Sequence, residues 1–494
     1  MRDAGLAVRS GLRMRANSAR VITRLFIPGQ EMVGGSESRA SNAITRVLAL
    51  SEAEVEDSLG DLFSRFETRH SDLAQVFEAH AERVAHYVPT PISVNRRQLL
   101  GATFTHEYSL EGASICNPSL VAHPDQGNLE AGALRAVLSY RSIGEGHHSA
   151  ICFRTGVIDS RGELTIDAPH AFPEIASISR GLLENEIFHA KLREADLDGA
   201  TAASVLDGLG ETFSYEELEV AIDQLLQQSD LRPNADETGR ALRSIAECIY
   251  DANFAASLDL SRRVLWPATA AESHGVEDAR FVRFDDDGVI RYLASYTAFD
   301  GNNVSQQLLE TSDFQSFHSL PMAGIGAQNK GMAFFPRRVD GRFMALSRYD
   351  RESNSLAVSD SPTSWDDVVS LQVPVYPWEL LQLGNCGSPI ELPEGWLVLT
   401  HGVGPMRTYG IGAILLDLDD PSKVIAQLDK PLLLPEAGEQ DGYVPNVVYS
   451  CGSLVHNGNL YLPYGISDQA MSYVTIDIQA LIEEFGLAES ELAS

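Results

Sequence analysis

Apolar residues recur at helical spacing in two stretches of the chain, residues 51–89 and residues 171–264. The first stretch opens on Ser51–Glu54 and the second contains Ser214–Glu217. Each of these is a capping box, in which a serine and a glutamate satisfy backbone N–H groups of the first helical turn. The pattern therefore predicts amphipathic helices in both stretches.

The remaining sequence alternates short β-like runs with polar turns that contain glycine. Five such turns resemble hairpin tips, and from the second onward they lie 53, 54 and 63 residues apart. Repeats of about 40–50 residues, each forming a small sheet, are typical of a β-propeller. We expect a mainly β protein, a five-bladed β-propeller with an N-terminal helical arm and a helical insertion. An irregular β-sandwich or several small α+β domains are the alternatives. The turns contain Gly162, Gly288, Gly341, Gly395 and Gly458.

This pattern divides the chain into consecutive segments. The apolar faces of the helical segments could cover the propeller, close a lid over its channel or form a homo-oligomer interface, and the sequence does not choose among them. The expected segments are a basic N-terminal tail over 1–50, a helical arm over 51–99, the first part of the propeller over 100–170, a helical insertion over 171–264 and the remainder of the propeller over 265–494.

Charge and targeting features narrow the class of protein. The chain carries 37 Lys and Arg against 69 Asp and Glu, a net charge of −32, which disfavours nucleic acid and anionic membranes as partners. The arginine-rich N-terminus lacks the apolar segment of a secretory signal, and no run of about 18 apolar residues occurs. We therefore expect a cytoplasmic protein.

Several kinds of chemistry lack their motif. The five cysteines include no CxxC, and neither a phosphate loop, an HExxH zinc motif nor a GxSxG elbow is present. His147 and His148 have no spaced third ligand, so we expect no metal site and no bound cofactor. What remains is a set of carboxylates, amides, arginines, histidine and aromatics in strand-like runs. Such groups grip sugars and cleave glycosidic bonds.

A series of ordered motifs resembles glycoside hydrolase family 130, the β-mannoside phosphorylases and β-1,2-mannosidases. The match covers roughly residues 100–165 and 265–480. The resemblance implies a five-bladed propeller and inverting cleavage of a β-linked mannoside, so the expected partner is a β-mannoside oligosaccharide. The motifs are Asn117–Pro118, Gly275–Arg280, Asn329–Arg337, Gly395–Leu397 with His401–Val403, Leu415–Pro421, Val444–Val448, and Tyr464–Gly465 with Asp468.

The resemblance also assigns roles to residues. Asp278 is similar to the family's general acid, which acts through the 3-hydroxyl of the sugar, and Ala279 stands where the family has proline. The residues expected to bind substrate are Asn117, Arg141, Arg280, Lys330, Tyr409 and Asp468.

The sequence departs from the family where the second reactant binds. Arg337 and His401 are similar to its phosphate-binding residues, but Gln382 aligns with a lysine and supplies no charge. Glu391 and Glu439 are candidate bases that could activate water. This departure favours a hydrolase, and the β-1,2 linkage is inferred from it alone. A phosphorylase using inorganic phosphate as co-substrate and releasing mannose 1-phosphate is the alternative, and a non-catalytic sugar-binding propeller is a second alternative.

Overall fold

The computed structural model describes residues 3–28, 38–88, 91–227 and 232–487. Strand predominates in these residues, and the chain divides into two compact units. The smaller unit comprises Asn17–Gly112 and His170–Glu174, and the larger unit comprises Met1–Ala16, Ala113–Pro169 and Ile175–Ser494.

The smaller unit is a group of helices with one antiparallel pair of strands, β3 and β4. The predicted capping box Ser51–Glu54 is confirmed at the start of α2. The helices extend beyond the predicted segment 51–99 in both directions. A Cβ atom on Gly101 would lie 1.7 Å from the backbone oxygen of Phe77, so only glycine lets α3 and α4 approach this closely. The elements are α1 (Arg39–Ala49), α2 (Glu52–Phe66), α3 (Leu73–Val84), α4 (Val94–Thr103), β3 (Val21–Leu25) and β4 (Thr105–Ser109).

Antiparallel meanders make up most of the larger unit, and the described residues contain five of them. The first comprises β5 (Ser114–Ala122), β6 (Leu134–Ile143), β7 (Ser149–Ile158) and β8 (Leu164–Ile166). The second comprises β15 (Gly275–Asp286), β16 (Val289–Phe299), β17 (Val304–Thr311) and β18 (Ser316–Pro321). The third comprises β19 (Ala333–Phe334), β20 (Phe343–Ser347), β21 (Asn354–Ser359) and β22 (Asp367–Gln372). The fourth comprises β23 (Gln382–Asn385), β24 (Ile390–Leu392), β25 (Gly395–Val403), β26 (Tyr409–Leu416) and β27 (Val424–Gln427). The fifth comprises β28 (Val448–Tyr449), β29 (Leu454–His456), β30 (Asn459–Ile466) and β31 (Ala470–Asp477), and α9 (Ile478–Glu484) follows it.

The glycine turns lie where the sequence predicts hairpin tips. Gly162 separates β7 from β8, Gly288 separates β15 from β16, and Gly458 separates β29 from β30. Gly341 lies in the turn closed by the bridge between Val339 and Arg342, and Gly395 begins β25 directly after β24. At Gly288 the φ angle is +90°, which a residue with a Cβ atom rarely adopts. The polar glycine turns are therefore a reliable signal for these meanders.

The segment predicted as a tail over residues 1–50 is different in the structure. β1 (Val8–Arg9) and β2 (Met14–Arg15) pair antiparallel with β31. From residue 17 onward the chain belongs to the smaller unit, where β3 and α1 form. Arginine-rich composition is a poor guide here because some of these side chains have acidic partners, as Arg9 has in Glu436.

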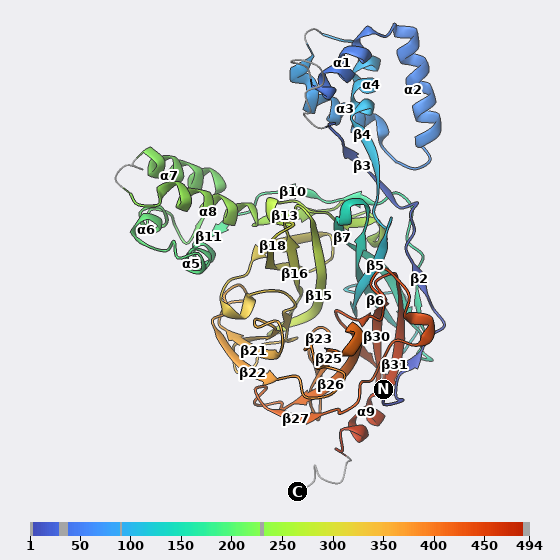
Figure 1. The fold of residues 1–494 in the computed structure, drawn as a ribbon, viewed down its shortest axis with the longest axis vertical. Coiled ribbons are helices and arrows are strands. Elements are labelled where there is room, and N and C mark those ends of the chain that lie inside the picture. Colours follow the sequence, from blue (N-terminus) through green and yellow to red (C-terminus); the bar gives the residue numbers. More distant parts are fainter. Residues whose placement is uncertain (1–2, 29–37, 89–90, 228–231, 488–494) are drawn as a thin grey trace. The chain divides into compact units, whose positions relative to one another are not determined.

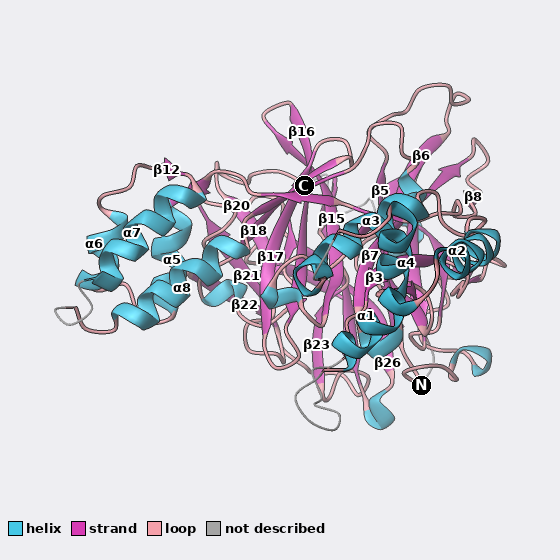
Figure 2. Ribbon diagram, turned by 90° about the horizontal axis from the view of Figure 1, so that it is seen from above, coloured by secondary structure: helices cyan, strands magenta, loops and turns pink. Residues whose placement is uncertain are grey.

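The predicted helical insertion folds as α5–α8 together with several short strands. Phe188 and Leu242, on α5 and α8, are buried in one hydrophobic cluster with Leu293 and Leu308 of β16 and β17. Figures 1 and 2 show these helices gathered in one group beside β18. The insertion therefore buries apolar surface against the meanders of its own chain. Its elements and the neighbouring strands are β9 (Glu174–Ile175), β10 (Ser177–Ser179), β11 (Leu183–Glu184), α5 (Asn185–Glu194), α6 (Ala200–Leu206), β12 (Thr212–Phe213), α7 (Tyr215–Gln227), α8 (Ala235–Glu247), β13 (Tyr250–Asn253) and β14 (Arg263–Leu265).

Predictions from the sequence concern the cysteines, membrane-spanning segments and metal ligands, and the structure bears on all three. All five cysteines are free thiols. In the described part of the chain, no helix is both long and apolar enough to span a membrane. Within the same residues, no three His, Cys, Asp or Glu side chains are grouped so that they could hold a metal ion.

Candidate active site

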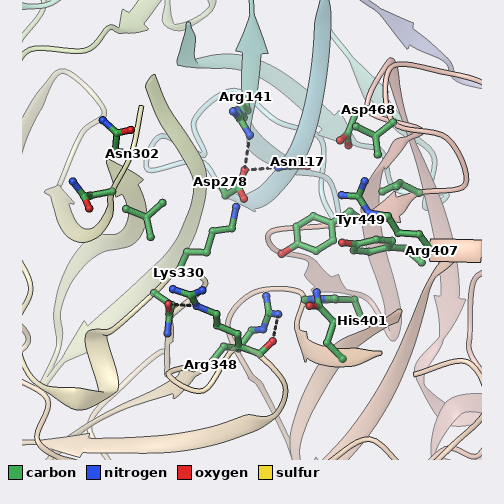
Figure 3. A pocket seen from close by; sticks show the side chains of 18 residues that line it. Asn117, Arg141, Asp278, Asn302, Lys330, Arg348, His401, Arg407, Tyr449 and Asp468 are labelled. Atoms are coloured by element: carbon green, nitrogen blue, oxygen red, sulfur yellow. Dashed lines mark hydrogen bonds and ion pairs between the residues drawn. The ribbon is translucent and has the colours of Figure 1, made fainter. Parts of the chain in front are cut away.

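A cavity of about 650 Å³ opens in the larger unit, and every one of the five meanders or the segment following it contributes to its lining (Figure 3). Most of its lining side chains are polar or charged. The lining residues are Asn117, Arg141, Asp278, Asn302, Asn303, Val304, Asn329, Lys330, Arg348, Arg351, Gln382, His401, Arg407, Tyr409, Val444, Val447, Tyr449 and Asp468.

Asn117 and Asp278 reach the cavity because their strands are interrupted by β-bulges. The ladder between β5 and β6 shifts register after Cys116, and the ladder between β15 and β16 shifts after Glu277. Asn117 and Asp278 have φ angles of 51° and 58°, in the left-handed region that non-glycine residues rarely occupy. Such a backbone costs on the order of 1–3 kcal/mol at each position, and it commonly marks a functional site.

Asp278 is buried and heavily contacted. Asn117 donates a hydrogen bond from Nδ2 to Asp278 Oδ1, and Arg141 Nη1 lies 3.7 Å from the same oxygen (Figure 3). Burial on its own would raise the pKa of Asp278, but the charges of Lys330 and Arg141 and the hydrogen bond from Asn117 outweigh it and lower that pKa. Asp278 is therefore a carboxylate at neutral pH.

Asp468 is a second carboxyl group with a different environment. It lies in the turn between β30 and β31, with a φ angle of 48°. Burial and then repulsion by Asp278 raise its pKa to about 6. Two carboxyl groups of one cavity thus have pKa values displaced in opposite directions, a pattern typical of acid–base sites.

The cations beside Asp278 are balanced by acidic partners. Arg141 Nη2 lies 2.6 Å from Glu277 Oε1, and Lys330 Nζ lies 3.6 Å from Glu277 Oε2. Glu277 and Asp278 together therefore compensate the charges of Arg141 and Lys330. This side of the cavity needs no further anion.

Arg348, in contrast, is a buried cation with no acidic partner among the described residues. It is 8% exposed, its Nε has no hydrogen-bond partner there, and its Nη2 donates to the backbone oxygen of Arg351 at 3.2 Å. A buried guanidinium without a counter-charge is costly, so this position favours binding of an anion.

His401 lies next to Arg348 and is held neutral. Its Nδ1 is 3.0 Å from the backbone oxygen of Asn385, and because a carbonyl can only accept, Nδ1 carries the proton. Burial, and then the nearby Arg348 and Arg280, lower the pKa of His401 well below its usual value. Its Nε2 is buried and has no hydrogen-bond partner in the described residues, so its lone pair is unused.

Gly384 makes room for this pair. A Cβ atom there would lie 2.4 Å from Arg348 Cδ and Nε and 2.5 Å from His401 Cε1. Any side chain at this position would therefore displace one or both of them.

Known proteins that are similar in sequence identify the family of this chain. Residues 252–485 match a family described as β-1,4-mannooligosaccharide phosphorylase of glycoside hydrolase family 130. The chain is 32% identical over 224 residues to the 1,2-β-oligomannan phosphorylase of Thermoanaerobacter sp. (strain X514). The aligned region covers 44% of this chain and 74% of that relative. The chain belongs to glycoside hydrolase family 130. It is an enzyme of that family, as the resemblance predicts.

Other members of family 130 match less of their length or less closely. The β-1,2-mannobiose phosphorylase of Listeria innocua is 29% identical over 229 residues, covering 44% of this chain and 62% of that relative. A solved structure of the β-1,2-mannobiose phosphorylase from Listeria innocua, in complex with β-1,2-mannobiose, aligns with a TM-score of 0.45 at 20% identity. That alignment covers 77% of this chain and 94% of the other chain.

Most of the substrate-binding residues that the family resemblance nominates do line the cavity. Arg280 does not. It is 1% exposed, and it donates from Nη1 to Asn385 Oδ1 at 3.0 Å and from Nη2 to Tyr449 Oη at 2.7 Å. It therefore orients the lining residue Tyr449 from behind the cavity wall and is not placed to contact substrate. The nominated residues in the lining are Asn117, Arg141, Asp278, Lys330, Gln382, His401, Tyr409 and Asp468.

The structure does not bring Arg337 or Glu391 to the cavity. Arg337 Nη2 lies 2.6 Å from Glu391 Oε1, and its Nε donates to Glu391 Oε2 at 2.8 Å. The guanidinium also stacks 4.9 Å from the centre of the Trp396 ring. The predicted phosphate-binding arginine and one predicted base thus pair with each other away from the cavity, so neither prediction is supported.

Glu439, the other predicted base, is also absent from the lining. Its Oε1 accepts a hydrogen bond from Tyr464 Oη at 2.6 Å, and its Oε2 lies 3.3 Å from Arg9 Nη2. A carboxylate with both oxygens engaged in this way is a structural support and is not placed to activate water.

Several lining residues escaped the sequence reasoning. A weak signal exists for Arg348, which directly follows the apolar run of β20, and for the amides in the turn between β16 and β17. Asn329, Val444 and Val447 belong to family motifs but were given no role, and no signal singles out the others. The missed residues are Asn302, Asn303, Val304, Asn329, Arg348, Arg351, Arg407, Val444, Val447 and Tyr449.

Proposed function

We propose that the protein is a β-mannoside phosphorylase, which transfers a mannosyl group from a β-1,2-linked oligosaccharide to inorganic phosphate. The observation that carries the proposal is Arg348, a buried guanidinium without an acidic partner among the described residues, beside the lone pair of His401 Nε2. A phosphate dianion would supply the missing charge, and a protonated phosphate oxygen could donate to His401.

The charges of the whole lining support the same anion. The lining has five cationic side chains against the two carboxyl groups Asp278 and Asp468. The protein as a whole carries −32, so this concentration of positive charge is local. A focused positive potential favours anion binding in a cleft. The cations are Arg141, Lys330, Arg348, Arg351 and Arg407.

The reaction would proceed as a single inverting displacement. A phosphate oxygen held by Arg348 forms a bond to the anomeric carbon, and the bond from that carbon to the leaving sugar oxygen breaks. Asp278 provides the proton that the leaving oxygen needs, through the 3-hydroxyl as the family resemblance implies. Because Lys330 and Arg141 lower its pKa, Asp278 takes that proton from solvent only when bound reactants change its surroundings, and it is a carboxylate again after the step.

Phosphorolysis replaces hydrolysis as the favoured reaction for a physical reason. The sequence favours hydrolysis because Gln382 lacks a charge and two glutamates could activate water. Gln382 does line the cavity, but Arg348 and Arg351 line it too and supply positive charge. Glu391 and Glu439 lie outside the lining. The β-1,2 linkage is proposed because the first relatives above act, by their names, on β-1,2-linked mannosides.

We further infer that the five meanders are the blades of a five-bladed β-propeller whose centre is the cavity. Two observations support this. Each meander, or the segment directly after it, contributes lining residues, and each contains one of the predicted glycine turns. A cytoplasmic location fits five free thiols, since disulfides are uncommon in reducing compartments. An oligomer through the helical segments remains a prediction.

Product analysis tests the proposed reaction. β-1,2-Mannobiose is incubated with the protein with and without inorganic phosphate, and the products are separated and identified. We expect mannose 1-phosphate and one equivalent of free mannose, formed only when phosphate is present. Free mannose released at the same rate in both samples would establish hydrolysis. Binding of the disaccharide without turnover in either sample would favour a non-catalytic sugar-binding protein.

A further inference from the structure

A segment near the N-terminus completes the fifth meander. In this segment, residues 3–16, β1 and β2 pair with β31, which makes them its outer strand. Ser10 donates its backbone N–H to the oxygen of Tyr473 at 3.0 Å, and Ser472 Oγ donates to the oxygen of Leu12 at 2.7 Å. We call residues 3–16 the N-terminal strap.

The strap places one arginine against the loop that follows the fourth meander. Arg9 is 19% exposed and donates from Nη2 to the backbone oxygen of Leu434 at 2.6 Å. Its Nη1 lies 2.8 Å from Glu436 Oε1, and its Nη2 lies 3.3 Å from Glu439 Oε2. A single guanidinium thus holds three points of one loop, as its planar fork allows.

Glu439 connects Arg9 to the turn that contains Asp468. Its backbone oxygen accepts a hydrogen bond from Ser467 Oγ at 2.6 Å, and Ser467 directly precedes Asp468. Ser467 and Asp468 both have left-handed φ angles, 47° and 48°. A strained turn of this kind persists only when its surroundings hold it, and Glu439 provides one of the contacts that do so.

The same turn fixes a second part of the cavity lining. Val444 donates its backbone N–H to the oxygen of Ser467 at 3.0 Å, and Ser467 donates its own to the oxygen of Val447 at 2.7 Å. Val444, Val447 and Asp468 all line the cavity. We call these three residues the strap-supported wall.

We propose that Arg9 is a positioning residue, which acts through Glu439 and Ser467 to hold the strap-supported wall in the geometry that binds the sugar. Arg9 does not line the cavity itself, and neither β25, which carries His401, nor the segment of Arg348 pairs with the strap in the described sheets. The wall is therefore expected to govern sugar binding and to leave phosphate binding unchanged. The kinetic part of this inference rests on the proposed function, whereas its structural part does not.

Hydrogen exchange tests the structural part in the full chain. Arg9→Gln removes the charge and leaves Glu439 buried without its cation, so the wall should open more often. We expect the backbone amides of Val444 and Ser467 to exchange about tenfold faster than in the wild type. The matched control is Arg15→Gln, because Arg15 lies in the same strap and its side chain has no hydrogen bond or ion pair with the described residues.

Binding and kinetics test the functional part. For Arg9→Gln we expect the KM or the Kd for β-1,2-mannobiose to rise about tenfold and the KM for phosphate to change less than twofold. Arg9→Lys should restore part of the sugar affinity, since an ammonium reaches one acidic partner but cannot make the fork. If Arg9→Gln does not accumulate as folded protein, Arg9→Lys serves alone and should show the same selectivity with a smaller rise.

Each contrary result has a distinct meaning. Unchanged exchange at Val444 and Ser467 would overturn the inference, and so would an equal increase at amides throughout the larger unit. Faster exchange with unchanged mannobiose affinity would also overturn it. If the wild type binds no mannobiose by calorimetry, the proposed function fails, and the exchange experiment still decides whether Arg9 holds the wall.

Discussion

The two charged sides of the cavity differ in how their charges are balanced. Around Asp278 the cations are matched by Glu277 and Asp278 itself, whereas Arg348 has no acidic partner in the described residues. A side whose charges are already balanced suits a neutral ligand, and a side with an unmatched buried cation suits an anion. Under the proposed function, the sugar would bind at the balanced side and the phosphate at the unmatched side.

The largest effect is expected at the balanced side. Asp278→Asn keeps the size of the side chain but removes the proton donor that the leaving oxygen needs. We expect the kcat for phosphorolysis of β-1,2-mannobiose to fall about 10³-fold. Glu391→Gln is the matched control and should retain activity within about twofold, because Glu391 pairs with Arg337 outside the cavity. A small effect of Asp278→Asn would show that Asp278 is not the proton donor.

The second effect concerns stability and pH. The pKa of Asp468 is raised to about 6, so between pH 4 and 6 the unfolded chain releases this proton while the folded protein keeps it. The free energy of unfolding therefore falls as the pH rises from 4 to 6, by at most about 3 kcal/mol. We expect Asp468→Asn to be more stable than the wild type at pH 7.5. At pH 4.5 this gain in stability over the wild type should be smaller. Urea denaturation at both pH values measures the difference, and a difference independent of pH would contradict the electrostatic account.

The third effect lies on the unmatched side. Arg348→Gln removes the buried positive charge, and we expect the KM for phosphate to rise about 30-fold while the KM for the sugar stays within twofold. Steady-state kinetics with either substrate varied separates the two constants. Arg337→Gln removes the same charge outside the cavity and should leave both constants unchanged. An equal rise of both KM values in Arg348→Gln would show that the two sides are not distinct.

The smallest effect tests the shape of the unmatched side without changing its charge. In Gly384→Ala the new Cβ atom would collide with both Arg348 and His401. We expect the KM for phosphate to rise about tenfold, with little change in the KM for the sugar. Gly199→Ala is a suitable control, because a Cβ atom there meets nothing within 4 Å. If the two variants behave alike, close packing under Arg348 has no part in anion binding.

Local signals in the sequence predicted local structure well. The capping box at Ser51 and the glycine turns such as Gly288 depend on residues a few positions apart, and the structure has both where the sequence predicts them. Family motifs likewise pointed to Asp278 and His401, which line the cavity. These signals are readable because the interacting groups are close in the sequence or belong to one motif.

The partners of charged residues could not be predicted in the same way. Arg337 is neutralised by Glu391, 54 residues further along the chain, whereas Arg348 has no acidic partner in the described residues. Nothing in the sequence distinguishes these two arginines, because the distinction is made by which strands the fold places side by side. The same reason explains why the strap was predicted to be a tail.

The pairing of the strap with β31 also has a consequence for protein synthesis. Leu12 and Ser472, which are hydrogen-bonded to each other, are 460 residues apart in the sequence. At about 5–20 residues per second, a ribosome needs about 25–90 seconds to travel that distance. The strap therefore leaves the ribosome long before its partner strand exists. A nascent or truncated chain that lacks β31 cannot complete the fifth meander, so the turn bearing Asp468 is among the last parts of the enzyme to take shape.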